Sequence, residues 1–84
     1  MLGNESSKTN LTVFPNPAVD RILINSSGAP VRFIELIDIK GRVIYKGEMS
    51  GDTFNLSEFE KGRYILRLYD ANKKMLNTKN IVKW

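Results

Sequence analysis

The 84-residue chain contains no cysteine and no histidine. Without cysteine, neither a disulfide nor a thiolate metal site can stabilise the fold. Without histidine, the chain lacks the commonest general base and the commonest transition-metal ligand of proteins. No glycine-rich loop opens a helix to hold a phosphate, and no serine lies in a motif that would supply an activating base. The sequence therefore predicts that the chain is not an enzyme and carries no cofactor or metal.

Long apolar runs are also absent. No run approaches the ~20 residues that a helix needs to span a bilayer. Residues 1–8 are mostly polar and contain no apolar signal-peptide core. We expect either that the chain stays where it is made or that it is a fragment whose export signal lies elsewhere. Residues 1–10 are predicted to be a flexible linker or an added lead-in, and residues 11–84 to form the domain.

Charge of one sign is not concentrated anywhere. Thirteen Lys and Arg against nine Asp and Glu give a net charge of +4, but the basic residues are scattered through strands and turns. Single-stranded nucleic acid would need aromatic and basic residues interleaved along one groove, and Arg67 with Tyr69 is the single pair of that kind. We therefore expect a solvated basic surface and no nucleic-acid partner, with a basic nucleic-acid-binding barrel as the third-ranked alternative.

The most regular pattern that is present lies in residues 63–69. Tyr64, Leu66 and Leu68 alternate with residues that include two arginines, and a period of two places the first set on one face of a strand. We expect that face to be the core. Just upstream, Gly62 permits a positive φ, and the Tyr64 hydroxyl can bond back to the backbone as in a tyrosine corner. The alternative is a core tyrosine that follows an ordinary turn.

Glycine, proline, asparagine and aspartate divide the rest of the chain into short β-prone segments. Strands are expected at residues 11–14, 21–26, 31–38, 42–46, 53–56, 63–69 and 74–84. This spacing predicts an all-β fold, an immunoglobulin-like antiparallel β-sandwich of about seven short strands, with a small barrel as the competing architecture. A terminal strand with a free edge could add to a partner's sheet or support an edge-strand dimer.

Two turns have particular chemistry. Pro15 and Pro17 remove two amide donors and give the first strand a stiff exit. Asp38 at the first position of a hairpin turn and Gly41 at the fourth suit a tight connection. A calcium loop around Asp38 is the alternative, but one carboxylate falls far short of the usual six to eight oxygen ligands.

Four features occur in order along the chain: residues 14–17 (Phe-Pro-Asn-Pro), residues 38–42 (Asp-Ile-Lys-Gly-Arg), a Leu-Ser-x-Phe-x-x-Gly-x-Tyr segment at 56–64, and a basic, β-branched ending at 79–83. Together they resemble the C-terminal sorting domain of the type IX (Por) secretion system, over residues 11–84. Phe59 stands where leucine is usual, and Trp84 is an unusual last residue. The resemblance implies that the sorting motif comprises Pro15, Asn16, Pro17, Asp38, Gly41, Gly62, Tyr64 and Lys83.

The resemblance also implies partners and a location. The domain would follow a covalently linked N-terminal cargo that is absent from this chain. It would direct that cargo from the periplasm to the outer-membrane translocon, and a surface sortase would then remove it, leaving the cargo at the cell surface or outside the cell. The alternative function is an accessory fibronectin-like or carbohydrate-binding module of an extracellular enzyme, which a row of aromatic rings on one exposed face would favour.

Overall fold

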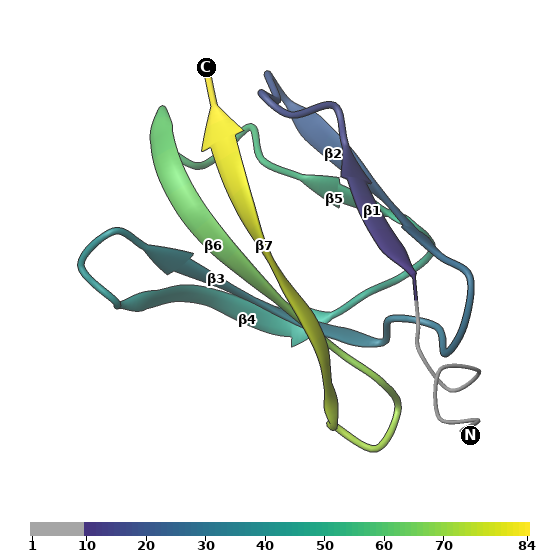
Figure 1. Cartoon of the computed structure of the whole chain (residues 1–84). Helices are drawn as coiled ribbons and strands as arrows, with labels where there is room; N and C mark the ends of the chain where they lie inside the picture. The colour runs from purple at the N-terminus through teal and green to yellow at the C-terminus, as the bar shows by residue number, and fades with distance from the viewer. Residues whose placement is uncertain (1–9) are drawn as a thin grey trace, which may run out of the picture.

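Seven β-strands make up the computed structural model, which describes residues 10–84 (Figure 1). No helix that could cross a membrane occurs among these residues. The predicted all-β class and the number of strands are confirmed. Residues 1–9 of the predicted lead-in lie outside the described residues. The strands are β1 (Leu11–Phe14), β2 (Arg21–Ser26), β3 (Phe33–Asp38), β4 (Val43–Glu48), β5 (Thr53–Asn55), β6 (Gly62–Tyr69) and β7 (Met75–Lys83).

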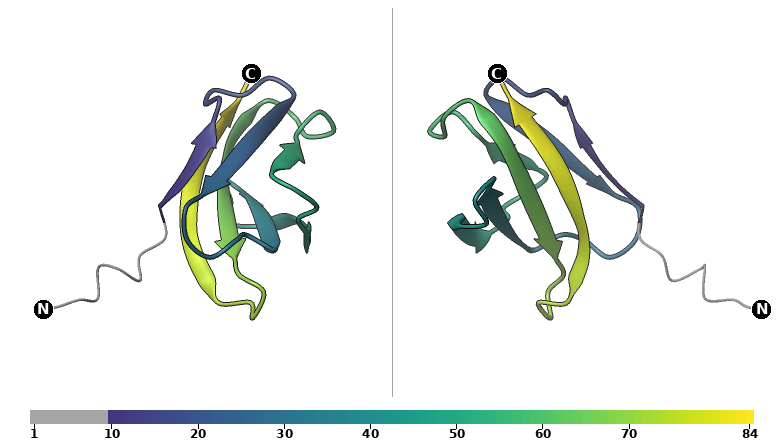
Figure 2. Two further views of the ribbon diagram at one scale, coloured as in Figure 1. Left: turned by 90° about the vertical axis from the view of Figure 1, so that its right-hand side faces the viewer. Right: turned by 60° about the vertical axis from the view of Figure 1, so that its left-hand side comes forward.

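The strands form two antiparallel sheets, ordered β1-β2-β5 and β4-β3-β6-β7. In the left view of Figure 2, β1 and β2 lie in front of β7, and in the right view β6 and β7 come forward, so the two sheets form two layers. The fourth strand joins the sheet of the third, sixth and seventh strands, as it does in immunoglobulin-like sandwiches with an added strand on that sheet. The predicted β-sandwich is therefore confirmed, and the small barrel is not the architecture of this domain.

The core lies between the inner faces of the two sheets. In β6, Tyr64, Leu66 and Leu68 are buried in it, as their alternation predicts. In β3, Ile34 and Leu36 belong to the core, whereas Ile37 is only 3% exposed but lies outside the core cluster. Strand β3 therefore buries apolar side chains on both faces, which explains why its sequence does not show which face is inward.

The turn before β6 is a tyrosine corner. The Tyr64 side chain is 8% exposed, and its hydroxyl donates a hydrogen bond to the Glu60 carbonyl. Gly62 has a φ of +148°, which L side chains rarely adopt. The preceding residues form a turn, and the Ser57 N–H donates to Asn55 Oδ1 at 2.7 Å. The Phe59 N–H donates to the Leu56 carbonyl at 3.0 Å, so a single hydrogen-bonded turn leads into the corner.

Strand β4 extends through Gly47 to Glu48, although the sequence predicts a strand only over residues 42–46. Gly47 pairs with Ile34 of β3. A Cβ built on Gly47 would lie 2.6 Å from the Tyr45 hydroxyl oxygen, so the missing side chain makes room for the Tyr45 ring. Gly47 is therefore a packing position within a strand rather than a turn residue.

Candidate functional site

The loop between β1 and β2 contacts the terminal strand through the side chain of Asn16. Asn16 Nδ2 donates a hydrogen bond to the Asn80 carbonyl at 2.8 Å, and the Val82 N–H donates to Asn16 Oδ1 at 3.0 Å. These are the backbone groups that flank Ile81 on the outer edge of β7. The Asn16 amide thus occupies the position that a neighbouring strand would take.

The backbone of Ala18 continues this contact. The Ala18 N–H donates to the Val82 carbonyl, and the Trp84 N–H donates to the Ala18 carbonyl, both at 2.8 Å. Ala18 is fully buried and forms a parallel bridge with Lys83. The expected free edge at the end of the terminal strand is therefore wrong, because the loop already pairs with it. We call residues 16–18 together with residues 80–84 the loop–strand contact.

Strand pairing brings the motif residues into one end of the sandwich. Asp38 on β3 pairs with Tyr64 on β6, and Tyr64 pairs with Ile81 on β7, which Asn16 faces from the other side. Two positions along β6 from Tyr64, Gly62 pairs with Lys83, and Lys83 bridges to Ala18. Residues far apart in the sequence therefore lie close together at this end of the sandwich.

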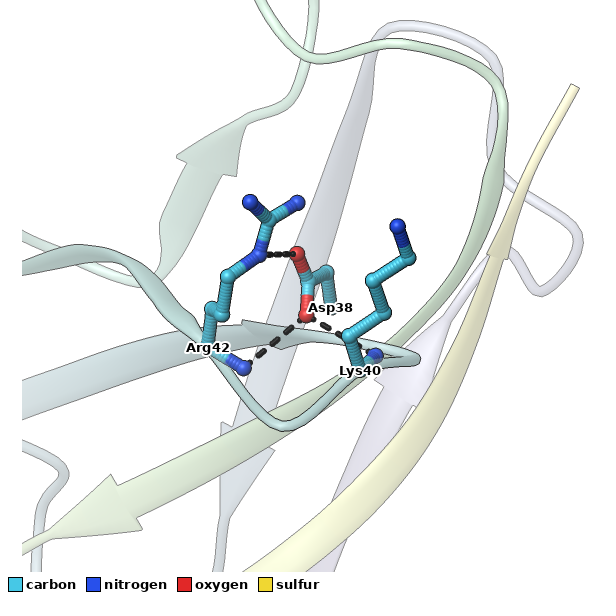
Figure 3. A network of polar contacts seen from close by, with 3 residues as sticks. All are labelled: Asp38, Lys40 and Arg42. Carbon is cyan, nitrogen blue, oxygen red and sulfur yellow. Dashed lines mark hydrogen bonds and ion pairs between the residues drawn. The ribbon is translucent and has the colours of Figure 1, made fainter.

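Asp38 organises the turn between β3 and β4 (Figure 3). Its Oδ1 accepts hydrogen bonds from the N–H groups of Lys40 and Arg42 at 2.9 Å, and its Oδ2 accepts from Arg42 Nε at 2.8 Å. The hydrogen bond from the Arg42 N–H contributes most to holding the pKa of Asp38 below its usual value. The other donors add to this effect, and burial opposes it. Gly41 has a φ of +86°, and its N–H donates to the Asp38 carbonyl at 3.0 Å.

The geometry of this turn bears on the calcium alternative. The turn's own N–H groups and the Arg42 guanidinium already donate to the Asp38 carboxylate. No group of three or more His, Cys, Asp or Glu that could hold a metal occurs within residues 10–84. Asp38 therefore acts as a turn-forming side chain.

Lys83 connects the terminal strand to the tyrosine corner. Its ammonium nitrogen donates a hydrogen bond to the Phe59 carbonyl at 2.7 Å. The resemblance implies that Lys83 is part of a recognised signal. In the structure Lys83 also holds the terminal strand to the corner. Sequence reasoning missed Ala18, because one small residue between Pro17 and Val19 carries no periodic signal.

Most aromatic side chains of residues 10–84 contact neighbouring groups, whereas Phe14 and Trp84 are exposed. The rings of Tyr45, Phe54 and Phe59 pack together with centroids 5.2–6.1 Å apart and close the side of the sandwich between β4 and β5. Tyr69 donates a hydrogen bond to Glu35 at 2.7 Å. Packing and hydrogen bonding therefore account for these four aromatic side chains.

Comparison with known proteins gives one family and two relatives. A family model described as "Secretion system C-terminal sorting domain" matches residues 12–83. An endo-acting ulvan lyase of Formosa agariphila is 35% identical over 78 residues, which cover 89% of this chain and 15% of the lyase. An ulvan lyase of Nonlabens ulvanivorans is 29% identical over 73 residues, which cover 83% of this chain and 14% of that enzyme.

The chain thus spans about one seventh of the length of these curated relatives, and no solved structure matches it. The family match covers most of the chain, and it spans all four features that the sequence presents in order. The chain belongs to the family of C-terminal sorting domains of the type IX secretion system.

Proposed function

We propose that residues 11–84 address a covalently linked N-terminal cargo to the outer-membrane translocon of the type IX system. The observation that carries this proposal is the loop–strand contact, in which Asn16 and Ala18 hold the end of β7 in a fixed position. A sorting label needs a surface that a partner can read, and it needs no reactive group of its own. The contact provides such a surface from two segments that lie together only in the folded domain.

The partner would read side chains of the loop–strand contact rather than its backbone. The outer edge of residues 80–84 already pairs with the loop, so that edge is not available for strand addition. The exposed apolar side chains of Phe14 and Val19 flank the contact in the sequence, and that of Trp84 belongs to it. We propose that these side chains, displayed around Pro15, Asn16 and Pro17, form the surface that the translocon recognises.

The events around recognition follow from the same proposal. The cargo reaches the periplasm, the translocon moves it across the outer membrane, and a surface sortase cuts in or before residues 3–10. The cargo then remains attached to the cell surface or is released. Two relatives that share this domain are named as ulvan lyases, and we propose a secreted polysaccharide-degrading enzyme as the cargo.

The experiment is a fusion of residues 11–84 behind a periplasmic reporter. We expect the reporter at the surface of cells that have the type IX machinery and in the periplasm of cells that lack it. Removal of residues 81–84 should keep the reporter in the periplasm, because it removes the strand end that Asn16 holds. Equal surface delivery with and without the machinery would refute the proposal.

A further inference from the structure

Two turns of the domain have the same hydrogen-bond pattern. In the β3–β4 turn, Asp38 Oδ1 accepts from the N–H groups two and four positions on at 2.9 Å, and the Asp38 carbonyl accepts from the N–H three positions on. In the β6–β7 turn, Asp70 accepts from the N–H groups at the same three positions. The third of these residues has a positive φ in both turns, +86° at Gly41 and +65° at Lys73. Each turn is therefore a matched reference for the other.

The side chains at the tips of the two turns differ. The residue after Asp38 is Ile39, which is 77% exposed, whereas the residue after Asp70 is Ala71. Because Ala71 supports the same hydrogen bonds, this turn does not need an isoleucine at that position. Ile39 also lies outside the core cluster. The fold therefore does not account for the large apolar side chain of Ile39.

The two turns lie at opposite ends of the sandwich. Strand pairing places Asp38 beside Tyr64, and Tyr64 beside Ile81 near the end of β7. The β6–β7 turn joins the other ends of its two strands, and it lies at the bottom of Figure 1, away from the C-terminus. Ile39 is therefore at the same end of the sandwich as the loop–strand contact.

A hollow of about 400 Å³ lies between Ile39 and the terminal strand. It is lined by the β3–β4 turn, by residues 63–65 of β6 and by residues 80–82 of β7. Ile65 is 40% exposed, and it alternates with buried residues of β6, so its side chain lies on the outer face of the sheet. Exposed apolar side chains that gather around a hollow are typical of an interaction site, whereas single ones are not.

Arg63 supplies the available charge at this hollow. Asp38 and Arg63 are the charged residues of its lining. The Asp38 carboxylate already accepts from the N–H groups of its own turn and from Arg42. The exposed Arg63 side chain takes part in none of the ion pairs formed among residues 10–84. An apolar hollow beside an unpaired guanidinium is complementary to an apolar side chain that lies next to a carboxylate.

We propose that this hollow binds a segment of a protein partner in which an apolar residue lies next to an aspartate or a glutamate. The apolar side chain packs between Ile39 and Ile65, and the carboxylate pairs with Arg63. The inference rests on the proposed function in one respect, because we place the segment in the export machinery that reads the adjacent loop–strand contact.

The covalently linked cargo fits the hollow less well. Strand β1 begins at Leu11 and runs toward the loop that holds the end of β7, so the N-terminal connection enters the domain at the opposite end. A partner that reads the loop–strand contact is already beside the hollow. The geometry therefore favours a partner segment over the cargo as the occupant.

The test truncates Ile39 and reverses the charge of Arg63 in the reporter fusion of the full 84-residue chain. Ile39→Ala introduces the residue type that Ala71 has in the matching turn, so the turn should still form. Its control is Met75→Ala, because Met75 is 52% exposed and begins β7 at the other end. The control for Arg63→Glu is Arg32→Glu, because Arg32 is exposed, forms no ion pair among residues 10–84 and bonds to the backbone of the other end.

We expect Ile39→Ala and Arg63→Glu each to lower surface delivery by about tenfold, because each removes one half of the contact. Both controls should deliver within about twofold of the parent, a change too small to reflect a lost contact. The melting temperatures of the four purified variants should stay close to that of the parent, since every changed side chain is exposed. If Arg63→Glu does not fold, Ile39→Ala and its control decide the matter.

Three results would overturn the proposal. Normal delivery by the folded Ile39→Ala and Arg63→Glu fusions would show that the hollow is not used, while the parent's delivery would still support the proposed function. A parent that is not delivered would overturn the proposed function and the partner together. Binding of the purified parent to vesicles of anionic phospholipid, lost in both variants, would assign the hollow to a membrane surface instead.

Discussion

The tyrosine corner gives a prediction that can be worked out from one hydrogen bond. Tyr64→Phe removes the hydroxyl that donates to the Glu60 carbonyl and leaves the buried ring in place. A net loss of about 1 kcal/mol in the free energy of unfolding is expected for such a bond. For a domain of this size, that loss corresponds to a fall of about 4–8 °C in melting temperature.

The assay is thermal and urea unfolding of the wild-type and variant domains, with Tyr45→Phe as the matched control. Tyr45 undergoes the same chemical change, but its side chain is partly exposed and no hydrogen bond of its hydroxyl is seen among residues 10–84. We expect the control to change the free energy of unfolding by less than about 0.5 kcal/mol. Equal losses in both variants would refute the structural role of the Tyr64 hydroxyl.

Three further predictions concern the backbone and the turns. Gly62→Ala and Gly62→Val should each lower the free energy of unfolding by roughly 1–3 kcal/mol, because φ is +148° and no atom lies within 4 Å of an added Cβ. If urea unfolding shows a much larger loss for valine than for alanine, crowding is the cause instead. Gly47→Ala should lower the melting temperature, because the added Cβ would lie 2.6 Å from the Tyr45 hydroxyl oxygen. The loss should be smaller when Tyr45 is also replaced by Phe, and an equal loss in both backgrounds would contradict this contact. Asp38→Asn should lower the melting temperature at neutral pH. The difference from wild type should disappear as the pH falls below about 4, because the folded pKa of Asp38 lies below its unfolded value and its stabilisation is lost on protonation. A difference in melting temperature that is constant from pH 7 to pH 3 would show that the charge of Asp38 is not involved.

Strand alternation and turn chemistry predicted most of the fold. The pattern around Tyr64, Leu66 and Leu68 identified the inner face of β6, because one face of a half-buried strand must be apolar. The same rule could not orient β3, where Ile37 is buried outside the core. It also missed the extension of β4, because Gly47 has the local preference of a turn residue, and its place in a strand depends on the Tyr45 ring.

The candidate site was predictable as a set of residues but not as a geometry. Pro15, Asn16 and Pro17 stand out as turn chemistry, yet the partner of the Asn16 amide lies more than sixty positions further along the chain. Hydrogen bonds between a loop side chain and a distant strand leave no periodic signal in the sequence. For that reason the sequence suggested a free terminal edge, and the structure shows an edge that is already paired.

The loop–strand contact is the feature on which the sorting account depends most. The direct test is the surface-delivered fraction of the reporter fused to an Asn16→Ala domain, measured beside the parent fusion in cells with the type IX machinery. Amide exchange at Val82 in the purified domain confirms that the contact is released. We predict that delivery falls in step with the loss of protection at Val82. An unprotected Val82 amide together with undiminished delivery would contradict the account.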